Sequence, residues 1–184
     1  MHAYITLARM AASEGDEARA FAYLEALASI GENRGTVRLV ATSLAERIRQ
    51  QATRNRPTQA AALLTELTAL AERSVMSDLL APQVCLDLEM ARIFAAVAAD
   101  DLASAGAYVA RAREFATDLN RGYETVQILA VNALLAERSG ESPVAFLVEA
   151  LSRAESGGLV RVFAATLPDL VDLVRRYSQD ASHI

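Results

Sequence analysis

The sequence contains no lysine, and all eighteen of its basic residues are arginine. This absence excludes mechanisms that need a lysine amine, including Schiff-base chemistry and the phosphate-binding lysine of a P-loop nucleotide site. An alanine-rich chain with arginine alone is typical of a GC-rich genome, so the missing lysine excludes mechanisms without indicating one.

Cysteine, aromatic residues and positive charge are also scarce. Cys85 is the one cysteine, so neither an intramolecular disulfide nor a cysteine-based metal site is possible, which fits a reducing compartment. Tryptophan is absent and aromatic residues make up 5% of the chain, which disfavours a groove that stacks sugar rings. The net charge of −5 argues against direct nucleic-acid binding, which needs a basic face.

Signals for export, membrane insertion and catalysis are missing as well. The amino terminus has no basic segment followed by a long apolar core, and apolar runs such as Ile93–Ala99 are too short to cross a bilayer. His2 and His183 lie at opposite ends of the chain, and neither has a partner at the spacing of a catalytic triad or metal site. Asp100–Asp101 is interpreted as a helix-capping turn and not as a metal site. We therefore expect a cytoplasmic, non-catalytic protein with no metal, no cofactor, and neither nucleic acid nor membrane as a direct partner.

Alanine and leucine are abundant, and they repeat in a helical pattern. Hydrophobic residues make up 53% of the chain, enough for a core. The recurring segments are A-Y-L-E-A-L at 22–27, A-L-L-T-E-L at 62–67, A-Y-V-A-R-A at 107–112 and F-L-V-E-A-L at 146–151. A repeat of about 40 residues is typical of an α-solenoid built from helix pairs, a class that binds partners along a groove and rarely performs chemistry.

Glycine, proline and turn residues divide the chain into helices. The expected helices are 3–14 and 17–30, 36–53 and 58–74, 78–99 and 102–119, 122–139 and 143–156, then a short apolar run at 159–164 and a last helix at 168–177. Gly31 is expected to end the second helix, and Pro143 to occupy the first position of the eighth. The prediction is an all-α fold: a right-handed α-solenoid of four antiparallel helix pairs that resemble tetratricopeptide repeats, plus a C-terminal helix.

These pairs are expected to form a single superhelical domain over 1–184. The repeats fall at about 1–34, 35–77, 78–120 and 121–157, with a cap at 158–184. The spacing predicts that Leu64 and Leu67 are buried in the second pair. In the first pair it predicts packing of Tyr4, Leu7, Ala8, Ala11, Ala20, Leu24 and Leu27. Arg47 takes the place of Leu7 in the second repeat. Glu89 and Arg92 occupy core-equivalent positions in the third, which indicates that either the repeat or its assigned register is distorted there.

A polar surface is predicted on the first helices of successive pairs, which line the concave groove of such solenoids. Thr42, Asp87 and Gln127 occupy repeat-equivalent positions, and Arg49 lies two turns beyond Thr42. In an exposed groove Arg49 would bind a carboxylate or phosphate in bidentate fashion, and Asp87 would pair with a ligand donor or with Arg49. The alternative is that the four residues form an ordinary solvated helix face.

The end of the chain carries a more specific pattern. Residues 146–163 read F-L-V-E-A-L-S-R-A-E-S-G-G-L-V-R-V-F, and residues 167–177 read L-P-D-L-V-D-L-V-R-R-Y. This segment resembles the closing part of the helical-repeat sensor region of large LuxR-family transcription activators of the maltose-activator type. The matching positions are Ala150, Leu151, Ala154, Glu155, Gly158, Val160, Arg161, Phe163, Leu170, Leu173 and Val174. With the upstream repeats, the resemblance covers nearly the whole chain.

The resemblance implies a three-part protein, in which an ATPase module precedes the sensor region and a DNA-binding helix-turn-helix follows it. This chain corresponds to the sensor, so its expected partners are those two modules and a small-molecule inducer or protein in the groove. A generic tetratricopeptide-like scaffold for protein partners, unrelated to transcription, is the alternative. An all-α enzyme is a third class, but no acid–base or nucleophile pair supports it.

Overall fold

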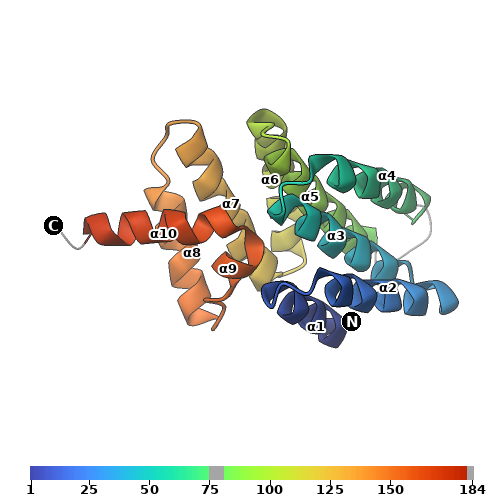
Figure 1. The fold of residues 1–184 in the computed structure, drawn as a ribbon. Helices are drawn as coiled ribbons and strands as arrows, with labels where there is room; N and C mark the ends of the chain where they lie inside the picture. Colours follow the sequence, from blue (N-terminus) through green and yellow to red (C-terminus); the bar gives the residue numbers. More distant parts are fainter. Residues whose placement is uncertain (75–80, 182–184) are drawn as a thin grey trace. The chain divides into compact units, whose positions relative to one another are not determined.

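The computed structural model describes residues 1–74 and 81–181, and all regular structure in these ranges is helical (Figure 1). The helices are α1 His2–Ser13, α2 Glu17–Asn33, α3 Val37–Thr53, α4 Pro57–Ser74, α5 Ala81–Ala98, α6 Leu102–Asp118, α7 Gly122–Arg138, α8 Val144–Ser156, α9 Val162–Thr166 and α10 Pro168–Ala181. The all-α prediction is confirmed for the described residues. The expected start of the fifth helix at 78–80 lies outside them.

Several predicted helix ends differ from the structure. Helix α2 continues through Gly31, and its turn comes at Gly35, which has a φ of 62°. Pro143 is the N-cap of α8 rather than its first helical residue. The apolar run predicted over 159–164 contains the start of the short helix α9.

The chain divides into two compact units, Met1–Asp100 and Asp101–Ile184. In the first unit each helix from α1 to α5 packs against the next in sequence, and α3 also packs against α5. In the second unit α7 is central, because α6, α8, α9 and α10 all contact it. The helices thus pack as neighbouring pairs within each unit, and the single superhelical domain expected over 1–184 stays a prediction.

The core of the first unit contains most of the residues that the repeat predicts. Ala8, Ala11, Ala20, Leu24 and Leu27 are all buried, and the small alanines let α1 and α2 approach closely. Three predicted core residues differ, because Leu7 is 40% exposed and both Tyr4 and Leu64 are only half-buried. A larger cluster joins α3, α4 and α5 and comprises Ala41, Leu44, Ile48, Ala60, Leu67, Ala71, Val84, Leu88 and Ala91.

One turn geometry recurs after α1, α2, α3, α5, α6, α7 and α8. Each turn has one residue in the left-handed region: Gly15, Gly35, Asn55, Asp100, Asn120, Gly140 and Gly158. In the turns other than that of Asp100, the next residue's N–H donates to a carbonyl five residues back, as from Arg121 to Ala116 O at 2.8 Å, which is the Schellman motif. The first three left-handed positions are evenly spaced, and so are the next three. A helix with its turn therefore takes roughly 20 residues and a helix pair roughly 40 residues, the range of helical solenoid repeats.

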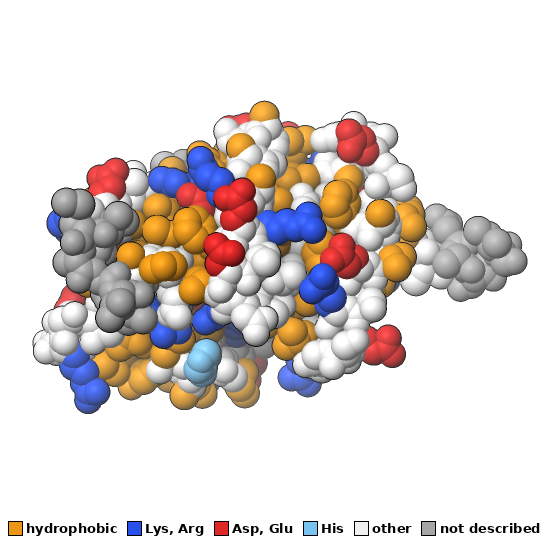
Figure 2. Space-filling view, turned by 180° about the vertical axis from the view of Figure 1, so that it is seen from behind, with side chains coloured by type: hydrophobic (Ala, Val, Ile, Leu, Met, Phe, Trp, Pro, Cys, Tyr) orange, Lys and Arg blue, Asp and Glu red, His pale blue; other side chains and the backbone are white. Residues whose placement is uncertain are grey.

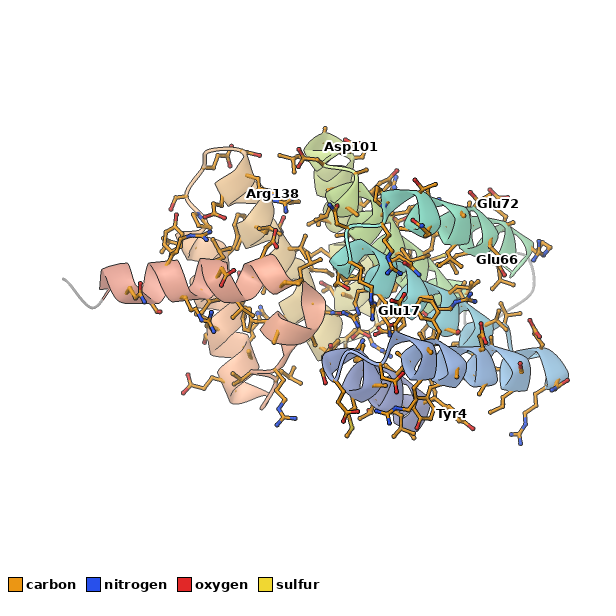
Figure 3. The ribbon with its side chains drawn as sticks, viewed as in Figure 1. Tyr4, Glu17, Glu66, Glu72, Asp101 and Arg138 are labelled. Atoms are coloured by element: carbon orange, nitrogen blue, oxygen red, sulfur yellow. The ribbon has the colours of Figure 1, made fainter. Side chains whose placement is uncertain are left out.

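Side chains fix the ends of some helices. Asp101, labelled in Figure 3, accepts a hydrogen bond from the Ser104 backbone N–H at 3.0 Å, so the predicted capping role of this turn is confirmed. Arg138, also labelled there, ends α7 and pairs with Asp169 of α10 at 2.7 Å. These contacts fix where α6 begins and tie α10 to α7.

The surface mixes charged and apolar side chains. On the face drawn in Figure 2, basic and acidic side chains are interspersed among apolar ones. The apolar residues Val144, Val148 and Leu151 of α8 are 45%, 61% and 40% exposed. None of the described helices combines the length and apolar character that crossing a membrane requires.

Gly31 packs α2 closely against the start of α3, which gives a first prediction. A Cβ atom at Gly31 would lie 2.8 Å from Val40 Cγ2 and 3.0 Å from the Thr36 carbonyl oxygen. We expect Gly31→Ala to lower the free energy of unfolding by about 1–3 kcal/mol through overpacking, despite the higher helix propensity of alanine. Urea denaturation followed by circular dichroism measures the change.

Gly106, inside α6, is the matched control. A Cβ there meets no atom within 4 Å, so Gly106→Ala should raise the free energy of unfolding by about 0.5–1 kcal/mol. Stabilisation by both substitutions would show that the approach at Gly31 is not tight.

Candidate functional site

The structure brings two of the predicted site residues together. The Thr42 hydroxyl on α3 donates a hydrogen bond to Asp87 Oδ2 on α5, with 2.8 Å between the oxygens. These positions are repeat-equivalent, and the packing of α3 against α5 places them side by side. Thr42 and Asp87 therefore form a polar contact between two first helices of the predicted pairs.

Arg49 lies on α3, but its side chain is buried and not exposed as a groove residue would be. It is 7% exposed, and its Nη2 is 2.5 Å from Glu46 Oε1. The same carboxylate also accepts a hydrogen bond from an arginine of α1, with 2.9 Å between Arg9 Nη2 and Glu46 Oε2. The three side chains form a cluster that ties α1 to α3, and a ligand-binding role of Arg49 stays a prediction.

The arginines control the ionisation of Glu46. Burial alone raises the pKa of this carboxyl, but the charges of Arg49 and Arg9 and the hydrogen bonds from both outweigh it. The pKa falls from 4.5 to about 2 as a result. Glu46 is therefore ionised at neutral pH although it is only 6% exposed.

Gln127 lies in the second unit, where it joins two helices. It is 4% exposed, and its Nε2 donates to the hydroxyl oxygen of Thr166 in α9 at 3.1 Å. That hydroxyl in turn donates to the Val162 carbonyl at 2.7 Å. Gln127 thus ties α7 to α9, and its predicted contact with a ligand stays a prediction.

Some buried polar side-chain atoms have no hydrogen-bond partner among the described residues. Gln50 on α3 is 1% exposed, and neither atom of its side-chain amide has a hydrogen-bond partner. The side-chain oxygens of Gln51 and Gln83 also lack one, as does Nε of Arg47, whose guanidinium lies 5.7 Å from the Phe21 ring centroid. The sequence pattern singled out Arg47, and it placed Gln83 on the polar face of the first helices. Gln50 and Gln51 were missed, because glutamine is equally common on a solvated helix face.

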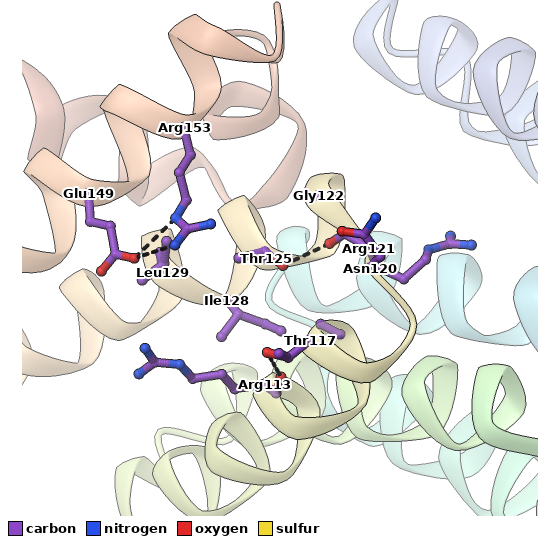
Figure 4. A pocket seen from close by; sticks show the side chains of 11 residues that line it. Arg113, Thr117, Asn120, Arg121, Gly122, Thr125, Ile128, Leu129, Glu149 and Arg153 are labelled. Carbon is purple, nitrogen blue, oxygen red and sulfur yellow. Dashed lines mark hydrogen bonds and ion pairs between the residues drawn. The ribbon is translucent and has the colours of Figure 1, made fainter.

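A cavity of about 360 Å³ lies inside the second unit, between α6, α7 and α8 (Figure 4). It is lined by Arg113, Ala116, Thr117, Asn120, Arg121, Gly122, Thr125, Ile128, Leu129, Glu149 and Arg153. Its volume falls within the range typical of small-molecule sites. Sequence reasoning missed it, because its charged side chains come from separate helices in a pattern that also fits a solvated surface.

The charges around this cavity are unequally paired. Arg153 Nε donates to Glu149 Oε1 at 3.0 Å, and Arg121 Nη2 is 2.5 Å from Glu124 Oε1. Among the described residues, the Arg113 guanidinium has no hydrogen bond, ion pair or ring contact. The lining residues thus carry three positive charges and one negative charge, in a chain whose net charge is −5.

Comparison with known proteins adds no family. No family model, curated protein or solved structure matches the chain. Within 1–74 and 81–181, no group of three or more histidine, cysteine or acidic side chains is placed to hold a metal ion.

Proposed function

We propose that this chain is a non-catalytic helical-repeat domain that senses an effector or a protein partner. The observation that supports this proposal is the set of buried polar side-chain atoms on α3 and α5. Gln50 is the strongest case, because its side-chain amide has no hydrogen-bond partner among the described residues. Each unsatisfied buried polar group costs about 1–3 kcal/mol. Such groups call for an explanation, and we propose that the helices that carry them form the binding surface.

The repeat supports the finer proposal of a right-handed α-solenoid. Evenly spaced turns, helices packed in neighbouring pairs and the packing of α3 against α5 are all expected of tetratricopeptide-like arrays. We propose four helix pairs over residues 1–157, with α9 and α10 in the cap.

The sequence pattern at 146–177 supports a place in a LuxR-family transcription activator of the maltose-activator type. In that proposal an ATPase module precedes this chain and a helix-turn-helix module follows it in the cytoplasm. The solenoid would pack on its ATPase module in one of two arrangements. An effector that binds one arrangement more tightly would shift the population toward it.

A scaffold that binds protein partners is the second candidate. The observation that favours it is the row of Val144, Val148 and Leu151, spaced by four and three residues along α8 and exposed by 40–61%. The coding sequence on either side discriminates the two proposals. A lysine-containing P-loop before the chain and a helix-turn-helix after it would support the activator, and their absence would favour the scaffold.

Two buried glutamines test the carrying observation. Gln50→Leu should raise the free energy of unfolding by about 1 kcal/mol, because it replaces an unsatisfied amide by an apolar group of similar size. Gln127→Leu should lower it by about 1–3 kcal/mol, because it leaves the Thr166 hydroxyl without its Gln127 partner. Urea denaturation of both variants gives the comparison.

A loss of stability from Gln50→Leu as large as that from Gln127→Leu would contradict the proposal. It would mean that the Gln50 amide is satisfied in solution and serves only the fold.

A further inference from the structure

We infer that the cavity between α6, α7 and α8 binds a small organic carboxylate, with the charged group at Arg113 and an apolar body against the cavity floor. This goes beyond the proposed function. It concerns the second unit alone and holds for a sensor and for a scaffold alike.

The floor of the cavity is apolar. Ala116, Ile128 and Leu129 line it, and they are only 1%, 1% and 2% exposed. They are the apolar part of the lining, and apart from Gly122 the other lining residues are polar or charged. An apolar group that covers this floor is removed from water at a gain of roughly 25 cal/mol per Å².

The rim supplies the positive charge. Figure 4 shows Arg113 from α6 and Arg153 from α8, with Arg153 joined to Glu149. Because Arg113 has no competing carboxylate among the described residues, it can bind an incoming anion without first breaking an ion pair. Arg153 can add a second contact by exchanging or sharing its bond with Glu149, and both arginines suit the planar, bidentate geometry of a carboxylate.

The start of α7 lies at the same rim. Gly122 is the first residue of α7 and lines the cavity, and the N-cap residue Arg121 makes no side-chain cap hydrogen bond. A Cβ at Gly122 would meet no atom within 4 Å, so the helix start is open on this side. The partial positive charge of a helix N-terminus adds to that of the arginines.

The hydroxyls of the rim do not serve as donors to an anion in this arrangement. The Thr117 hydroxyl donates to the Arg113 carbonyl and the Thr125 hydroxyl to the Arg121 carbonyl, each at 2.8 Å. Selectivity for the anion therefore rests on Arg113, on Arg153 and on the Gly122 N–H.

Sodium benzoate is the probe, because it combines one carboxylate with an apolar ring. The ¹⁵N-labelled chain is titrated at constant ionic strength, and the backbone amide of Gly122 and the Nε–H resonances of Arg113 and Arg153 are followed. We expect saturating shifts of these resonances in the millimolar range, weaker binding of inorganic phosphate, and no saturation with neutral benzamide. No saturation with benzoate would overturn the inference, and equal binding of phosphate would reduce the site to a general anion site without an apolar pocket.

Arg113→Gln should weaken benzoate binding about tenfold or more, since it removes a charged hydrogen-bond partner. Arg111→Gln is the matched control on the same helix, where Arg111 stacks 5.0 Å from the Tyr108 ring centroid and does not line the cavity. It should leave the affinity within about twofold. Equal losses from both variants would show that benzoate responds only to the general charge of α6.

Glu149→Gln tests the opposite change of charge, because it removes a negative charge from the cavity lining. It frees Arg153 from its carboxylate partner and removes the one negative charge of the lining, so benzoate should bind at least as tightly as to the unmodified chain. Weaker binding to this variant would contradict the charge argument. Arg113 is exposed and Glu149 is half-buried at the surface of α8, so these variants are expected to fold.

Discussion

Glu46→Gln is expected to lower the free energy of unfolding by about 3–5 kcal/mol at neutral pH. The substitution removes the carboxylate that pairs with Arg49 and Arg9, and leaves a neutral amide beside the Arg49 guanidinium, whose side chain is only 8% exposed. Removing the carboxylate of a buried ion pair costs far more than removing that of an exposed pair. Urea denaturation measures the loss.

Glu14→Gln is the control. Glu14 pairs with Arg19 at the surface, where the two side chains are 57% and 48% exposed. Its loss should cost less than about 1 kcal/mol. A similar effect from both substitutions would mean that the cluster around Glu46 is open to solvent in solution.

The same residue gives the chain a defined acid sensitivity. The pKa of Glu46 is lowered from 4.5 to about 2 in the folded chain, so its ionised form stabilises the fold above pH 4.5. This stabilisation, about 3 kcal/mol, is lost as the pH falls from about 4.5 to about 2. The unfolding free energy of Glu46→Gln should vary less with pH across this window, and parallel curves for the two proteins would contradict the assignment.

Leu67→Ala is expected to cost about 2–5 kcal/mol, and more than Leu64→Ala. Leu67 is fully buried in the cluster that joins α3, α4 and α5, whereas Leu64 is half-buried and packs against that cluster. Truncation of Leu67 therefore removes more contacts and leaves a larger cavity. Midpoint shifts in urea give the ranking, and a larger loss for Leu64→Ala would mean that Leu64 is the more deeply buried of the two.

Local patterns predicted most of the fold. Helical periodicity and turn residues placed the helices of the described ranges within a few positions of their observed bounds. Gly31 shows what such patterns leave open. A glycine that ends a helix and one that admits a neighbouring helix look the same in sequence, and the difference lies in the approach of Val40 from α3.

The candidate site was less predictable, because its interactions depend on distant residues. Repeat offsets placed Thr42 and Asp87 on matching helices, but the burial of Arg49 depends on Glu46 and on Arg9, which comes from a different helix. Charges at core-equivalent positions predicted a distortion of the repeat or of its register. Glu89 is 5% exposed and pairs at 2.6 Å with the half-buried Arg92, so a partly buried ion pair occupies that position.

The recurring left-handed turn has a consequence for how such a chain can change in length. One residue inserted within a helix rotates all that follows by about 100° about the helix axis, which would carry a core residue such as Leu67 off its packing face. A segment inserted from one left-handed residue to the next instead adds a whole helix together with its turn. The chain is therefore expected to lengthen by duplication, or shorten by deletion, in steps of one helix or one helix pair. Single-residue insertions are expected only in the turns.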